Sequence, residues 1–136
     1  ARWDFGPNND KSHEFYLHDF PGDREYAMAE EVLRSWNITF TKTLRPSQYA
    51  RDQKGYAKGE TQPFPFFKAV RKNLPYHFDL RHSSITWVSD RRWSGGPVGT
   101  AYFSPDSRNG KILWGGFSIF GGLLDDYING FLPIGA

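Results

Sequence analysis

Histidines are the side chains of this sequence best suited to move protons or hold a metal near neutral pH. The chain has four of them, and two frame the segment His13-Glu14-Phe15-Tyr16-Leu17-His18. A zinc-binding pair on a helix lies one turn apart, as in His-Glu-x-x-His, so that both rings share one face. Here one further residue separates the two histidines, and on a strand this spacing sends the rings to opposite faces. We therefore predict no metal site and no cofactor within this chain.

A second group of reactive side chains lies in the segment Tyr76-His77-Phe78-Asp79-Leu80-Arg81-His82. Histidines, an acid and an arginine are the groups with which a metal-independent ribonuclease transfers protons and stabilises a phosphorane. Alternation along a strand, however, places His82 on the side opposite to His77 and Asp79. The net charge of +2 is also too small to attract RNA strongly. A small cysteine-free ribonuclease is thus an alternative, and nucleic acid is not the expected partner.

The chain is unusually aromatic, with 12 Phe, 7 Tyr and 5 Trp. Such side chains fill cores and also make adhesive surfaces. We expect Trp36 and Trp87 in the core and Trp93, in a polar loop, on the surface. A non-catalytic structural or binding subunit is therefore a further alternative.

The length of 136 residues suits one domain or half of one. The absence of cysteine excludes disulfides and thiolate metal sites. No apolar stretch is long enough to span a membrane, and Ala1-Arg2-Trp3-Asp4 does not begin a signal peptide. If the protein is exported, we expect this chain to be a processed form.

Apolar residues recur at helical spacing along 23–41, where we predict a helix capped by Asp23 that packs through Val32, Leu33 and Trp36. Runs typical of strands occupy 13–18, 84–88, 100–104 and 111–118. The fold class predicted is α/β (α+β), a mixed twisted sheet with one long helix packed on it.

The remaining segments have weaker patterns. Prolines and glycines, among them Gly55, divide 45–78 into an irregular connection with one short helix near 66–72. Asn109-Gly110 is typical of the turn between two antiparallel strands. The tail 121–136 fits a short helix from about 123 to 129.

Three short patterns give this order of elements a family resemblance. They are Arg2-Trp3-Asp4 before the first strand with Trp36, Asn37 and Phe40 in the helix; then Asp79, Arg81, Ser83, Ile85, Trp87 and Val88; and then Pro105-Asp106-Ser107-Arg108-Asn109-Gly110-Lys111-Ile112-Leu113. The chain resembles over about residues 2 to 120 the start of the catalytic domain in a family of secreted bacterial zincin (metzincin-like) metallopeptidases. The third pattern departs from the family by inverting Asp-Pro and by Lys111 in place of glutamate.

The resemblance implies that this chain is the N-terminal, substrate-rim half of a zinc metallopeptidase domain. The zinc-binding helix would lie beyond Ala136, so zinc is expected only with the missing half and the chain is not catalytic alone. The expected partners are a second chain or segment carrying the zinc motif, or further copies of this chain. Secretion is implied in the same way.

In this family an edge strand beside the active site pairs with an extended peptide substrate. The resemblance places that strand immediately before the active-site helix, at 111–117. The predicted substrate-binding residues are Lys111, Ile112, Leu113, Trp114 and Gly115.

Overall fold

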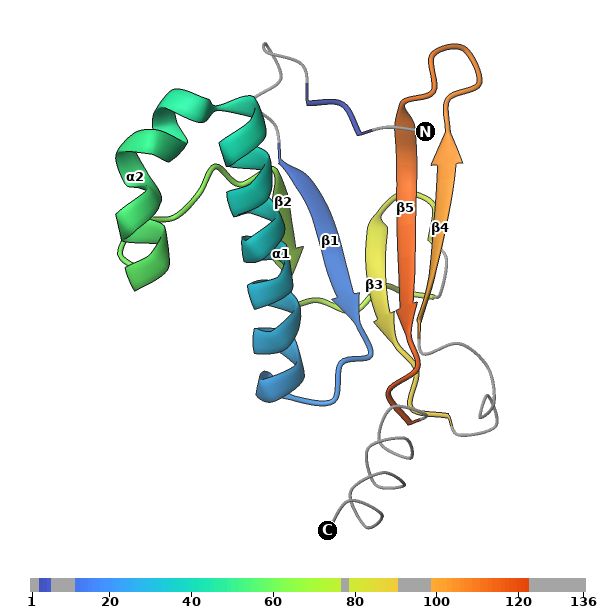
Figure 1. Ribbon diagram of the computed structural model, residues 1–136. Coiled ribbons are helices and arrows are strands. Elements are labelled where there is room, and N and C mark those ends of the chain that lie inside the picture. Colours follow the sequence, from blue (N-terminus) through green and yellow to red (C-terminus); the bar gives the residue numbers. More distant parts are fainter. Residues whose placement is uncertain (1–2, 6–11, 77–78, 91–98, 123–136) are drawn as a thin grey trace, which may run out of the picture.

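The computed structural model describes residues 3–5, 12–76, 79–90 and 99–122 (Figure 1). The described residues form a five-stranded mixed sheet and two helices, which confirms the predicted α/β class. The elements in chain order are β1 (His13–His18), α1 (Asp23–Leu44), α2 (Pro46–Lys58), β2 (Phe67–Val70), β3 (Ser83–Trp87), β4 (Gly99–Pro105) and β5 (Ile112–Ile119).

The strands lie in the order β2-β1-β3-β5-β4. β1 runs parallel to both β2 and β3, and β3 runs parallel to β5. β4 alone is antiparallel, to β5, and forms the outer strand on that side of the sheet. The four strands predicted from the sequence are therefore present, with bounds that differ by one residue at most ends.

The long helix α1 begins at Asp23 and continues three residues beyond the predicted end, to Leu44. Asp23 is not its cap: Gly22 occupies that position, and no side chain caps the helix. Asp23 and Glu25 instead lie in the first turn and Lys42 lies in the last. Their charges interact favourably with the helix dipole at both ends of α1.

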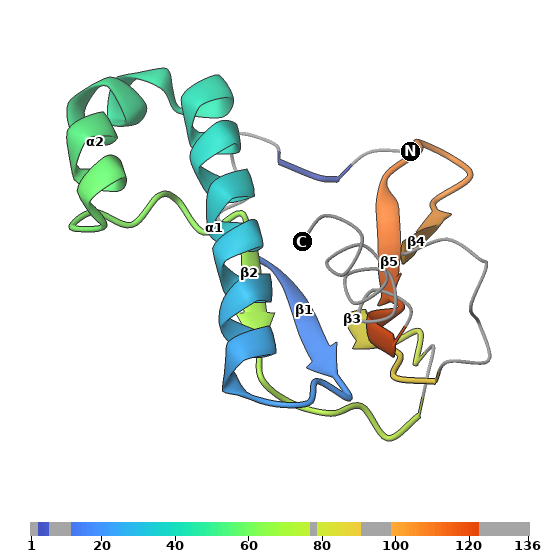
Figure 2. The same cartoon turned by 60° about the horizontal axis from the view of Figure 1, so that its bottom comes forward.

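The packing of α1 differs from the prediction. Leu33 packs against the core, but Val32 and Trp36 are 55% and 53% exposed, so the expected burial of those two side chains is wrong. The helix lies over β2 and β1 instead of the middle of the sheet (Figure 2). Asn37 and Thr41 are buried instead: Asn37 bonds to Phe67 of β2, and Thr41 accepts the N–H of Phe64 just before that strand.

The segment near 66–72 is strand β2, and the short helix predicted there is wrong. Its pairing is non-local: Phe67 lies opposite His13, and Ala69 lies opposite Phe15. A four-residue strand of this kind is stabilised by its partners and not by its own sequence pattern.

The connection 45–78 is also less irregular than predicted, because it contains α2. Pro46 occupies the first turn, where its missing N–H costs nothing, and Gly59 ends the helix with a left-handed φ of 76°. Gly55 lies inside the helix and does not break it. A Cβ at Gly55 would lie about 2.1 Å from the Thr61 hydroxyl oxygen, so the glycine allows the chain to fold back onto the helix.

Aromatic rings dominate the core between α1 and the sheet. Phe15, Leu17 and Ile85 are at most 9% exposed, and Trp87 lies partly buried against them as predicted. The rings of Trp3 and Phe5, from the N-terminal segment, lie 5.8 and 5.5 Å from the ring of Phe67. The predicted tail helix at 123–129, Trp93 and His77 lie outside the described residues.

Candidate peptide-binding edge

The strand predicted as the substrate edge is an interior strand. β5 pairs with β3 on one side and with β4 on the other. The register with β3 begins at Gly116, so 116–119 lies between two strands, whereas 112–115 pairs with β4 alone. Only the part that is paired on both sides, 116–119, has no room for a further strand. The substrate role of residues 111–115 therefore stays a prediction.

The five residues predicted to bind substrate have other contacts or positions. Lys111 precedes β5, and its Nζ lies 3.0 Å from the carboxylate of Asp4. Trp114 is buried and donates its Nε1–H to the carbonyl of His82 at 2.7 Å. Ile112 is partly exposed and Leu113 is 68% exposed at the start of the strand.

Gly115 provides room for a tryptophan ring. A Cβ there would lie 2.8 Å from the Trp3 ring, which covers this point of the sheet. The N–H of Gly115 donates to the hydroxyl of Ser83 at 3.1 Å. Gly116 plays the same part for the Trp114 ring, 2.4 Å from a Cβ added there.

The outer position on this side of the sheet belongs to β4. Six of its residues are exposed and only Thr100 is intermediate. The strand Gly-Thr-Ala-Tyr-Phe-Ser-Pro contains no charged side chain, although charges are a common means of blocking an edge. Tyr102 and Phe103 are each 45% exposed.

Alternation identifies which main-chain groups of β4 face outward. The N–H of Gly115 donates to Ser83 of β3, and the carbonyl of Ile119 accepts from Val88, which follows β3. Because the direction of main-chain groups alternates along a strand, the N–H and C=O groups of Gly116 and Ser118 point toward β4. Their register partners Tyr102 and Thr100 consequently face β5. The N–H and C=O groups of Ala101 and Phe103 therefore point away from the sheet.

An apolar groove of about 570 Å³ runs between α1 and β4 on the same face of the sheet. α1 forms one wall and β4 the other, and strands β1, β3 and β5 form the floor. The lining side chains are almost all apolar: Val32, Leu33, Trp36 and Phe40 from α1; Phe15, Ile85, Phe117 and Ile119 from the floor; and Ala101 and Phe103 from β4. Trp3 also lines the groove.

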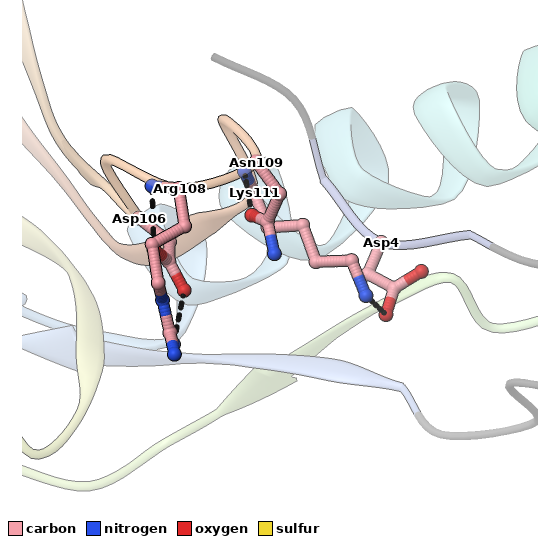
Figure 3. Close-up of polar contacts among 5 residues, drawn as sticks. All are labelled: Asp4, Asp106, Arg108, Asn109 and Lys111. Atoms are coloured by element: carbon pink, nitrogen blue, oxygen red, sulfur yellow. Dashed lines mark hydrogen bonds and ion pairs between the residues drawn. The ribbon is translucent and has the colours of Figure 1, made fainter.

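Hydrogen bonds between side chains and backbone organise the hairpin loop between β4 and β5 (Figure 3). Asp106 accepts hydrogen bonds from the backbone N–H of Arg108 at 2.9 Å and from its guanidinium at 3.1 and 2.9 Å. This guanidinium holds the pKa of Asp106 below its usual range. Gly110 takes a φ of 73°, the left-handed conformation that the predicted Asn-Gly turn requires.

The N-terminal segment is attached to this hairpin. Figure 3 shows Lys111 reaching from the loop to Asp4. Nε2 of His13 lies 3.1 Å from the Asp4 carbonyl oxygen, and the Trp3 ring contacts Phe103 of β4 at 6.4 Å. The segment thus connects β1 to the far side of the sheet across one end of the groove.

In the described part of the predicted ribonuclease cluster, Asp79 and Arg81 bond to each other. Asp79 is 1% exposed, and its two oxygens lie 2.9 and 2.7 Å from guanidinium nitrogens of Arg81. These hydrogen bonds lower the pKa of Asp79 to about 2. The ring of His82 lies 4.6 Å from that of Tyr16. The pair of Asp79 and Arg81 fixes the turn before β3.

The described histidines have separate surroundings. Nδ1 of His18 accepts the N–H of Leu74 at 2.9 Å, whereas His13 lies among the rings of Trp3 and Phe5. No group of three or more His, Asp or Glu side chains that could hold a metal occurs within the described residues. In the same part of the chain no helix is long and apolar enough to cross a membrane.

The sequence contains one residue, Pro105, whose position is compatible with an edge strand. Pro105 ends β4, next to a shift of register between Ser104 and Pro105. Because proline lacks an N–H, it is confined to edge strands, strand ends and bulges.

Comparisons with protein-family models, with curated proteins and with solved structures gave no match.

Proposed function

We propose that this chain is the N-terminal, substrate-rim half of a secreted zinc metallopeptidase domain. In this proposal the zinc ligands belong to a further segment or a second chain, and this chain supplies the sheet, the long helix and the edge that receives substrate. Peptide is the substrate class, because an edge strand recognises an extended main chain.

The groove beside α1 is the observation that carries the proposal. Its walls and floor are apolar, and Val32 and Trp36 are half exposed in it. Soluble monomers rarely leave contiguous apolar surfaces of this kind open. The active-site helix of a zincin packs against the sheet, and the groove offers such a helix a place alongside α1.

The position of β4 supports the proposal further. The outward N–H and C=O groups of Ala101 and Phe103 border the groove, so a peptide on this edge would lie beside the helix that fills it. We therefore propose β4 as the strand that forms the substrate rim.

Residues of the three sequence patterns have structural roles in this chain. Asn37 binds the main chain of β2, Asp79 pairs with Arg81 before β3, and Asp106 organises the β4–β5 loop. Lys111, the departure from the family pattern, pairs with Asp4 of the first pattern.

Reconstitution tests the proposal. The chain alone and the chain coexpressed with the polypeptide that continues or accompanies it would be assayed on an unstructured protein substrate, with zinc measured in each sample. We expect cleavage and one bound zinc per complex only in the second sample, with loss of cleavage on adding a chelator. Cleavage by the chain alone that persists in chelator would contradict the proposal.

A non-catalytic subunit that assembles through its sheet is the second candidate. The uncharged β4 edge and the exposed apolar groove favour it, since both promote association without any chemistry. A stable, zinc-free complex that shows no peptidase activity with any partner would select it over the first candidate.

A further inference from the structure

We infer that the β4 edge selects an extended peptide with apolar side chains at two alternate positions, those opposite Ala101 and Phe103. This inference rests on the proposed function and specifies the substrate of the same site. It follows from the direction of the main-chain groups of β4 and from the face on which its side chains lie.

The main chain limits the register. An antiparallel peptide bonds only to residues whose N–H and C=O point outward, and on β4 these are Ala101 and Phe103, with Gly99 at the start of the strand. The next outward position is Pro105, which has no N–H and follows the register shift. The pairing therefore ends at Phe103, and only a short stretch of peptide can bond to the main chain of β4.

The side-chain face sets the selectivity. Ala101 lies opposite Phe117, and the rings of Phe103 and Phe117 are 5.8 Å apart, so both β4 side chains lie on the groove face. Directly opposed residues of neighbouring strands direct their side chains to the same face. The two peptide residues opposite Ala101 and Phe103 consequently enter an apolar surface, where a charged side chain would lose its hydration.

The residue between them meets different surroundings. It would lie opposite Tyr102, whose side chain is on the other face and whose hydroxyl lies 3.2 Å from that of Thr100. A polar residue is therefore accepted at this central position.

Two synthetic pentapeptides with blocked ends test the pattern. One, Thr-Leu-Thr-Leu-Thr, has alternate leucines, and the other, Thr-Leu-Leu-Thr-Thr, has the same composition with adjacent leucines. Each would be titrated into the full chain, and the backbone amide signals of Ala101 and Phe103 followed by NMR. We expect the alternating peptide to bind roughly tenfold more tightly and to protect those two amides from hydrogen exchange.

N-methylation separates main-chain from side-chain recognition. Methyl groups on both leucine nitrogens should abolish binding, whereas one on the central threonine nitrogen should be tolerated, because that N–H points away from β4. On the protein, Phe103→Ala should weaken binding and Tyr102→Ala should not. These two variants are matched, since both side chains are 45% exposed.

The outcomes separate the side-chain selectivity of the β4 edge from the proposed function of the chain. Equal binding of both pentapeptides, with the two amides still protected, would overturn the selectivity and leave the proposed function standing. Protection of those amides in the chain without peptide, increasing with protein concentration, would assign the edge to a second copy and overturn the inference. The proposed function is tested separately, by zinc-dependent cleavage after reconstitution, which requires neither pentapeptide.

Discussion

The side-chain amide of Asn37 forms two hydrogen bonds with the backbone of Phe67, donating to its carbonyl and accepting from its N–H, each at 2.8 Å. The amide thus takes the place of a neighbouring strand at the outer side of β2. Because Asn37 is 6% exposed, water cannot easily replace it.

Asn37→Ala should therefore lower the free energy of unfolding by about 2 to 4 kcal/mol, because two buried main-chain groups lose their partner. Asn37→Asp should also destabilise the protein, since aspartate cannot donate to the Phe67 carbonyl. The exposed neighbour Ser35→Ala is the control and should change little. Denaturant unfolding of the three variants measures this, and a neutral Asn37→Ala would refute the role of the amide.

Acid should weaken the fold through Asp79. Its pKa is about 2 in the folded protein, below the ordinary value of 3.8. The stabilisation is therefore fully present above about pH 4 and is lost as the pH falls through about 2. Asp79→Asn should be less stable near neutral pH and should show a smaller loss across this range.

Unfolding at a series of pH values tests this expectation. Arg81→Ala serves as the comparison, because removing the guanidinium should raise the pKa of Asp79 toward and beyond its ordinary value. An unchanged carboxyl titration in Arg81→Ala, followed by NMR, would show that the pair is not the cause.

The pair of Asp4 and Lys111 should contribute little but measurably. The two side chains are 37% and 42% exposed, so we expect a coupling energy of about 0.5 kcal/mol that decreases with added salt. A double-mutant cycle with Asp4→Ala and Lys111→Ala provides its own control. Strictly additive effects at low salt would mean that this ion pair does not help to hold the N-terminal segment.

The open apolar groove should make the isolated chain prone to self-association. We expect it to bind a hydrophobic dye and to self-associate at tens of micromolar, and Val32→Glu or Trp36→Glu to reduce both effects. Met28→Glu is the matched control, because Met28 is 50% exposed on the same helix but does not line the groove. Sedimentation and dye fluorescence give the readout, and a dye-free monomer would mean that the groove is not an interface.

The sequence predicts the elements with local signals better than their places in the sheet. The periodicity of α1 and the Asn-Gly turn after β4 are local signals, and the sequence predicts both the helix and the turn. β2 was not predicted, because it depends on β1 and on Asn37, which are distant in sequence. Gly55 was misleading because glycine accommodates close contacts as well as breaking helices.

The candidate site shows the same limit. The runs at 100–104 and 111–118 both predict strands, but only pairing decides which is interior. The longer apolar run of β5 fits its interior position, and Pro105 fits the edge position of β4. Exposure of Trp36 could not be predicted, since helical periodicity identifies an apolar face without identifying what covers it.

Native mass spectrometry of the protein isolated from its own source tests the central claim most directly. The account predicts that this chain occurs joined to, or tightly bound with, a polypeptide that contains His-Glu-x-x-His, together with one zinc ion per complex. Its occurrence as a zinc-free monomer with no such polypeptide, in a preparation that retains its biological activity, would contradict the account.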